Sequence, residues 1–117
     1  MVGLKNGIAL LASVAFLALP QSGNAADDVG FGAIRSHNWA VAERQLLAGL
    51  EKNPNNVFRL LNLAWVYAQT GRKQEAAMIY QRILNKDEDQ LAALPTGEGK
   101  SVKALAERGL TLVQGGG

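Results

Sequence analysis

The sequence predicts an all-α fold in which a helical hairpin is repeated along the chain. A shift of 34 residues places Ala42 on Ala76 and Leu50 on Leu84. The matched residues belong to runs in which apolar side chains recur every three or four positions, which gives each helix one apolar face. Self-similarity at a period of this length is typical of proteins whose repeated units stack side by side.

The first 25 residues differ in composition from the rest and predict a secretory signal peptide. Lys5 precedes an apolar run from Ile8 to Leu19, which Pro20 ends. Small residues follow, so we expect cleavage after Ala25 or one residue later. The run is shorter than the roughly 20 residues that span a bilayer, and its retention as an uncleaved anchor is the alternative. The mature chain would be a periplasmic or secreted bacterial protein without a stable membrane span.

The first copy of the repeat covers about residues 27–56. Its first helix is expected to be short and frayed because it carries Gly30 and Gly32, and glycine inside a helix costs about 1 kcal/mol relative to alanine. Pro54 cannot continue a helix and therefore separates the two copies. We expect Asn55 to cap the helix that follows.

The second copy, about residues 57–90, carries a more complete pattern of large and small positions. The positions of this pattern, in order along its two helices and their turn, are Leu60, Leu63, Ala64, Tyr67, Gly71, Ala76, Tyr80 and Leu84. This pattern resembles the tetratricopeptide repeat, a helix–turn–helix unit of about 34 residues. It departs from the family pattern at Ile83, usually alanine, and at Glu88, usually proline. The resemblance covers roughly residues 27–89 and implies a short right-handed α-solenoid of about two repeats.

The chain beyond the second copy does not continue the repeat. Pro95 would break another first helix, so we expect a loop over residues 91–99 and a capping helix near residues 100–113. The apolar or small face of that helix is expected to hold Val102, Leu105, Ala106, Gly109 and Leu112. The helical domain would span residues 26–114, followed by a disordered tail at residues 115–117.

The stretch LPTGEGKSV, Leu94 to Val102, looks like a phosphate-binding loop. Gly99-Lys100-Ser101 matches the end of the pattern G-x-x-x-x-G-K-[ST], but Leu94 stands where the first glycine is required. No strand-forming run precedes it. A small nucleotide-binding enzyme is therefore the less favoured alternative, and a flexible loop before the last helix is the expectation.

The composition offers little for catalysis, metal binding or nucleic-acid binding. The chain has no cysteine and one histidine, His37, which we place in the turn between the first two helices. The acidic run 87–89 lacks the ligand spacing of a calcium loop. The net charge is +2 and no block of lysine and arginine occurs, so the basic footprint of a nucleic-acid-binding protein is missing. We expect a non-enzymatic protein without cofactor or metal.

The resemblance implies a binding surface on the first helix of the second copy. In tetratricopeptide proteins, the first helices line a concave groove that binds peptides or protein segments. The corresponding residues here, spaced by three and four on one helix face, are Phe58, Leu61, Asn62, Trp65 and Gln69. Trp65 would offer the large platform common at binding hot spots. In the alternative interpretation, Phe58, Leu61 and Trp65 pack inside the domain.

The predicted function is non-catalytic protein binding or scaffolding in the bacterial envelope, with a peptide or protein segment in the concave face. An accessory subunit or chaperone of a secretion, pilus or outer-membrane assembly machine is the alternative. The expected partner is a protein, a peptide or a second copy of the chain, and not a nucleic acid.

Overall fold

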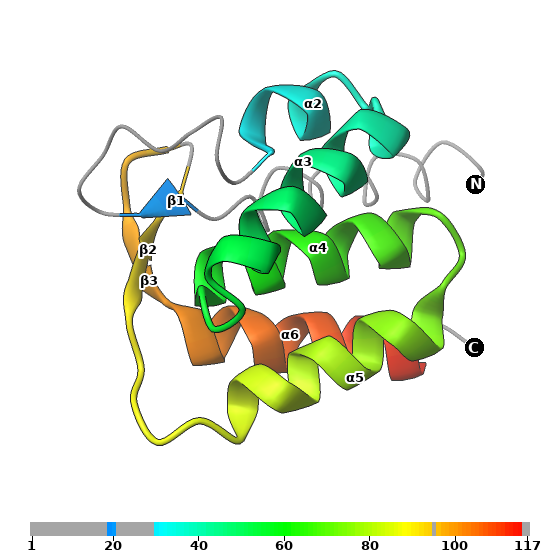
Figure 1. The fold of residues 1–117 in the computed structure, drawn as a ribbon. Coiled ribbons are helices and arrows are strands. Elements are labelled where there is room, and N and C mark those ends of the chain that lie inside the picture. Colours follow the sequence, from blue (N-terminus) through cyan, green and yellow to red (C-terminus); the bar gives the residue numbers. More distant parts are fainter. Residues whose placement is uncertain (1–18, 21–29, 95, 116–117) are drawn as a thin grey trace.

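Helices make up most of the residues that the computed structural model describes, which are 19–20, 30–94 and 96–115 (Figure 1). In chain order the described elements are β1 (Leu19–Pro20), α2 (Phe31–Arg35), α3 (Trp39–Lys52), α4 (Val57–Gln69), α5 (Lys73–Leu84), β2 (Leu91–Ala93), β3 (Gly99–Ser101) and α6 (Val102–Gly115). The mostly helical class is confirmed, while the small sheet was not expected.

The helix α2 is as short as the sequence predicts. It has five residues, and the backbone of Gly30 before it is left-handed, with φ of 71°. A side chain at Gly30 would also press on Leu46 of α3, at 3.2 Å from its Cγ. The expected start of this helix near residue 27 lies outside the described residues.

The turns that end α2 and α4 have the same backbone hydrogen bonds. After α2, the N–H of His37 donates to Ile34 and the N–H of Asn38 donates to Ala33. After α4, the corresponding bonds run from Gly71 to Ala68 and from Arg72 to Tyr67. This is the Schellman arrangement, which requires one left-handed residue. That residue is His37 in the first turn, with φ of 59°, and Gly71 in the second, with φ of 84°.

The break between α3 and α4 lies at Pro54, as expected, but the cap is one residue later than predicted. Asn56, not Asn55, precedes α4, and its side-chain oxygen accepts from the N–H of Arg59 at 3.0 Å. The side chain of Asn55 turns toward α5 instead, where it accepts from Arg82 at 3.3 Å. The tight turn, in which Asn56 N–H donates to the carbonyl of residue 53, moves the last non-helical position to Asn56.

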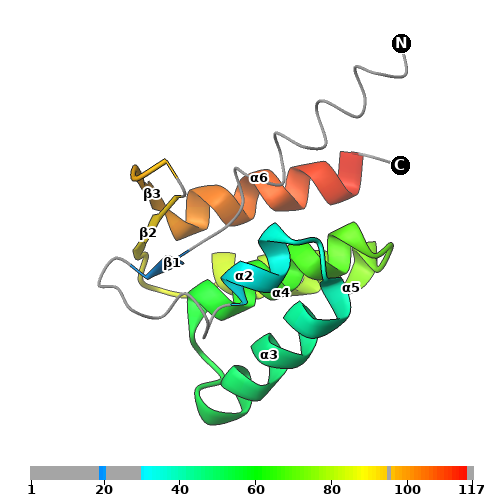
Figure 2. The ribbon, with the colours of Figure 1, turned by 90° about the horizontal axis from the view of Figure 1, so that it is seen from above.

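The helix α4 forms the centre of the domain. Its buried residues are Val57 and all of residues 60–66, so it is covered all round, as expected for a helix with apolar residues on every side. The helix α3 packs on one side of it and α5 and α6 pack on the other (Figures 1 and 2). Ala42 of α3 and Ala76 of α5, which the 34-residue shift aligns, are both fully buried.

The contact between α5 and α6 depends on one glycine. Tyr80 of α5 is 1% exposed, and a methyl group added at Gly109 of α6 would overlap its ring. Burial raises the pKa of the Tyr80 hydroxyl. Of the face predicted for the capping helix, Val102, Leu105, Ala106 and Gly109 are buried. The prediction was wrong for Leu112, which is 44% exposed, because in the last turn of α6 it is the neighbouring Val113 that packs against the core.

The expected loop after α5 contains an antiparallel hairpin. The strand β2 pairs with β3, with Ala92 opposite Lys100, and β2 also pairs with β1, with Leu19 opposite Ala93. The described strands thus form a sheet in the order β1-β2-β3. Gly97 turns the hairpin with φ of 94°. The strands are too short and too mixed in composition to give the alternating pattern by which a sequence reveals a strand.

The first and last described residues can be compared with the predicted signal peptide and the predicted C-terminal tail. Gly115 is the last residue of α6, so the predicted disordered tail begins one residue too early, and residues 116–117 lie outside the described chain. Of the predicted signal peptide, the described residues are Leu19 and Pro20. Cleavage after Ala25 therefore stays a prediction.

Candidate partner-binding surface

The five predicted binding residues share α4 but differ in accessibility. Leu61, Asn62 and Trp65 are 1%, 0% and 4% exposed. Phe58, one turn before Leu61, is half-buried, and Gln69 at the end of the helix is exposed. The spacing of three and four therefore does place them on one side of α4, but the middle of that side is covered in the folded chain.

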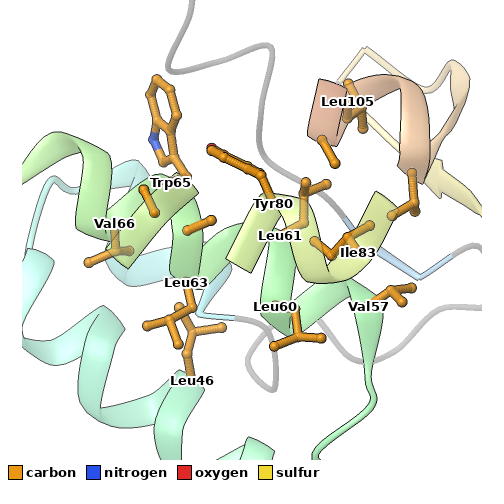
Figure 3. Packing of buried hydrophobic residues seen from close by; sticks show 14 of the residues in the cluster. Leu46, Val57, Leu60, Leu61, Leu63, Trp65, Val66, Tyr80, Ile83 and Leu105 are labelled. Atoms are coloured by element: carbon orange, nitrogen blue, oxygen red, sulfur yellow. The ribbon is translucent and has the colours of Figure 1, made fainter. Parts of the chain in front are cut away.

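Trp65 lies on the side of α4 away from α3. Figure 3 shows its ring extending from the helix in the direction opposite to Leu63, which points toward Leu46. Asn62 is the one buried polar or charged residue in the part of the chain that the structure describes. Asn62 and Trp65 each have an interaction partner within the folded chain. As the chain is folded here, both side chains contribute to its packed core.

An ion pair connects the two helical hairpins. Arg72, at the start of α5, donates two hydrogen bonds to Glu43 of α3, at 2.6 and 3.1 Å. Its guanidinium also lies over the ring of Tyr67, 4.4 Å from the ring centre. The hydrogen bonds from Arg72 lower the pKa of Glu43. Burial, with the charge of Glu43 nearby, raises the pKa of the Tyr67 hydroxyl.

The stretch that resembles a phosphate loop has a different geometry. Gly99, Lys100 and Ser101 form β3, and α6 begins directly after them. The Oγ of Ser101 accepts from the N–H of Ala104 at 3.0 Å, and Asp89 accepts from the N–H of Lys103 at 3.0 Å. The Ser101 hydroxyl also donates to Asp89. At the start of α6, where a phosphate would meet free N–H groups, those of Lys103 and Ala104 are therefore bonded to side chains of the chain itself.

The carboxylate of Asp89 is thus the cap of α6. Burial alone would raise its pKa, but the hydrogen bonds from Ser101, Lys103 and Gln90 together lower it. In the sequence, Asp89 was considered only as part of an acidic run without the spacing of a calcium loop, so this role was not predicted. Ser101 directly before an apolar helix is an N-cap signal that indicates part of it.

Helix boundaries repeat with the same period as the sequence. The helices α2 and α4 end at Arg35 and Gln69, and α3 and α5 begin at Trp39 and Lys73, so each pair is 34 residues apart. Comparison with protein-family models, curated proteins and solved structures gives no match for the chain. Its function must therefore be inferred from its own packing and surface.

A polar hollow lies between the α3–α4 connection and the end of α5. Its volume is about 500 Å³, and Asn55, Asn85, Lys86 and Gln90 are among its lining residues. Lys86 donates to Asn55 at 3.4 Å across it. The lining mixes amides with charges of both signs, so it does not favour one kind of ligand.

The residues that the structure describes hold neither a metal-binding cluster nor a candidate membrane span. Within them, histidine and acidic side chains do not gather in a group of three or more that could hold a metal ion. Of the helices in ranges 30–94 and 96–115, none is long and apolar enough to cross a bilayer.

Proposed function

We propose that the chain is a non-catalytic protein-binding module of the bacterial envelope, built as a short right-handed solenoid of about two tetratricopeptide-like repeats. The observation that carries this proposal is the 34-residue spacing of its turns. His37 and Gly71 are both left-handed, both close the same pair of hydrogen bonds, and are 34 positions apart. The sequence and the backbone thus have one common period, which is the length of the tetratricopeptide unit.

The packing of the helices supports the same proposal. In order along the chain, α2 packs on α3, α3 on α4, α4 on α5 and α5 on α6. Stacked repeats bury their apolar faces in this way, each element against its neighbours. The helix α6 covers the far side of α4 and α5, which is the place of a capping helix.

The proposed partner is a peptide or protein segment that binds at the accessible ends of the α4 face predicted as the binding surface. Gln69 and Phe58 are the accessible positions of that side, at its two ends. Trp65 and Leu61 lie between them and are buried, so a partner that reaches them must open the packing around them. We place the first contacts at Gln69 for this reason.

The proposal includes export, with residues 1–25 removed as a signal peptide. It rests on the basic start, the apolar run and the small residues before the cleavage position. Removal of this segment would also remove β1, because Leu19 and Pro20 belong to it.

Site-specific photo-crosslinking in the periplasm tests the proposed surface. A photoreactive residue at Gln69 should give a discrete crosslinked product with a partner protein. The matched control is Met78 on α5, which is 71% exposed and lies off the proposed surface. Equal crosslinking from both positions, or none from Gln69, would contradict the assignment of the binding side.

A further inference from the structure

The outer edge of β2 is built to accept an additional antiparallel strand. In the full chain that strand is β1, which pairs Leu19 with Ala93 and Pro20 with Ala92. If residues 1–25 are removed, as proposed above, β2 loses this neighbour. An exposed strand edge with unpaired backbone groups is a template for pairing with another chain.

The hydrogen bonds of the hairpin show which backbone groups become free. The N–H of Leu94 donates to Glu98 and the N–H of Val102 donates to Gln90, both at 2.8 Å. Because hydrogen-bonded pairs alternate along an antiparallel ladder, Ala92 is also bonded to β3. The N–H and C=O groups of Leu91 and Ala93 therefore point to the other edge, where β1 lies.

The two edges of the hairpin differ in how they are protected. On β3, Lys100 is exposed, and lysine on an edge strand discourages pairing with other chains. The strand β2 has the sequence Leu-Ala-Ala, without charge or proline. Its Leu91 is one of the exposed large apolar residues, at 57%. Without β1, the edge of β2 would therefore be open, neutral and partly apolar.

We propose that the mature protein forms a dimer through this edge, with β2 of a second copy in the place of β1. A two-fold axis at Ala92 sets Leu91 of each copy opposite Ala93 of the other. The free N–H and C=O groups of Leu91 in one copy then pair with those of Ala93 in the other, and the reverse, so all four free groups of each copy are hydrogen-bonded. The two Leu91 side chains become diagonal neighbours, within reach of one another, and each faces a small residue. Such an interface is isologous and closed.

The dimer is expected to be weak, because three residues a side bury far less than a standard protein interface. Sedimentation of the protein recovered after export should show reversible association that increases with concentration. The full chain, purified with residues 1–25 in place, should stay monomeric over the same range, because β1 covers the edge.

Edge variants test the surface directly. Leu91→Lys should raise the dissociation constant about tenfold or more, because a charge is placed at the pairing edge. Met78→Lys is the matched control, an exposed apolar residue on α5, and should leave the constant unchanged. Ala93→Pro removes an outward N–H while leaving the β3 ladder intact, and Ala93→Val retains that N–H. The proline variant should therefore lose association and the valine variant should keep it.

The failures of the two proposals can be told apart by intact mass. A leader-free protein that stays monomeric, or that associates equally well as Leu91→Lys, overturns the dimer and leaves the proposed function standing. Recovery of exported protein with residues 1–25 still attached overturns the proposed processing and the open edge together.

Discussion

The two helical hairpins follow the same plan but are held in place to different degrees. In the first, α2 contributes one buried residue, Ile34. In the second, α4 alone contributes eight, among them Leu60 and Trp65. Their turns have the same hydrogen bonds, yet one uses His37 and the other Gly71 at the left-handed position. A hairpin with the same backbone plan can therefore form even where its own sequence is less suited to the turn, provided that the neighbouring hairpin contributes most of the buried residues.

The largest expected effect on stability comes from a substitution in the core of the second, better-packed hairpin. Trp65→Ala should lower the free energy of unfolding by about 3–5 kcal/mol, because a large buried side chain is replaced by a cavity. Denaturant unfolding of the full chain measures this. Gln69→Ala, on the same helix but exposed, should stay within about 0.5 kcal/mol. A small loss at Trp65 would indicate instead that its ring belongs to an accessible groove.

Substitutions at the left-handed residues of the two turns should show how far the two hairpins differ in stability. Gly71→Ala should destabilise by about 1 kcal/mol, because residues with a side chain avoid the left-handed region. His37→Gly should stabilise the fold by up to about 1 kcal/mol, because glycine adopts the left-handed region without strain. The gain is reduced by the loss of the stacking between His37 and Trp39, whose ring centres are 5.3 Å apart. Thermal melts of both variants give the two signs. Changes of the same sign would show that the two turns are not equivalent.

The smallest expected effect concerns the ion pair that joins the hairpins. Glu43 has a lowered pKa through its hydrogen bonds with Arg72, so its contribution to stability is present at neutral pH and is lost as the pH falls through that lowered value. The pair is partly exposed, with side chains 37% and 25% accessible, so about 0.5–1 kcal/mol is expected.

Glu43→Gln should remove this contribution at pH 7 and should matter progressively less in acid. Asp89 also has a lowered pKa, so the wild type should lose further stability in the same direction. Only the difference between wild type and Glu43→Gln isolates the pair. A difference that persists unchanged at low pH would assign the effect to packing and not to charge.

The second hairpin could be predicted well from the sequence because its signals are local. Ala76 is a small position of the repeat pattern, Gly71 belongs to the turn between its helices, and Leu60 and Leu63 recur on one helix face. Each follows from spacing and residue type, and the structure places each accordingly. The solenoid of tetratricopeptide repeats that these features imply remains a proposal.

The features that could not be predicted from the sequence depend on contacts between distant parts of the chain. The strand β2 is recognisable only from its pairing with β3 and with residues 19–20, some 70 positions away. The spacing of Trp65 identifies a helix face but not what covers it. Asp89 caps α6 from across the hairpin, twelve residues before Ser101, and a local pattern does not reveal that partnership.

The packing order of the helices also has a kinetic consequence. Because each helix packs mainly on the next in the chain, most native contacts are close in sequence, and helical proteins of this kind fold in microseconds to milliseconds. Synthesis proceeds at only about 5–20 residues per second. The domain can therefore fold almost as soon as it is made. For the proposed export, the time available to capture the chain unfolded is short, and whatever recognises its first residues must act before α6, which completes the cover of α4 and α5, has been made.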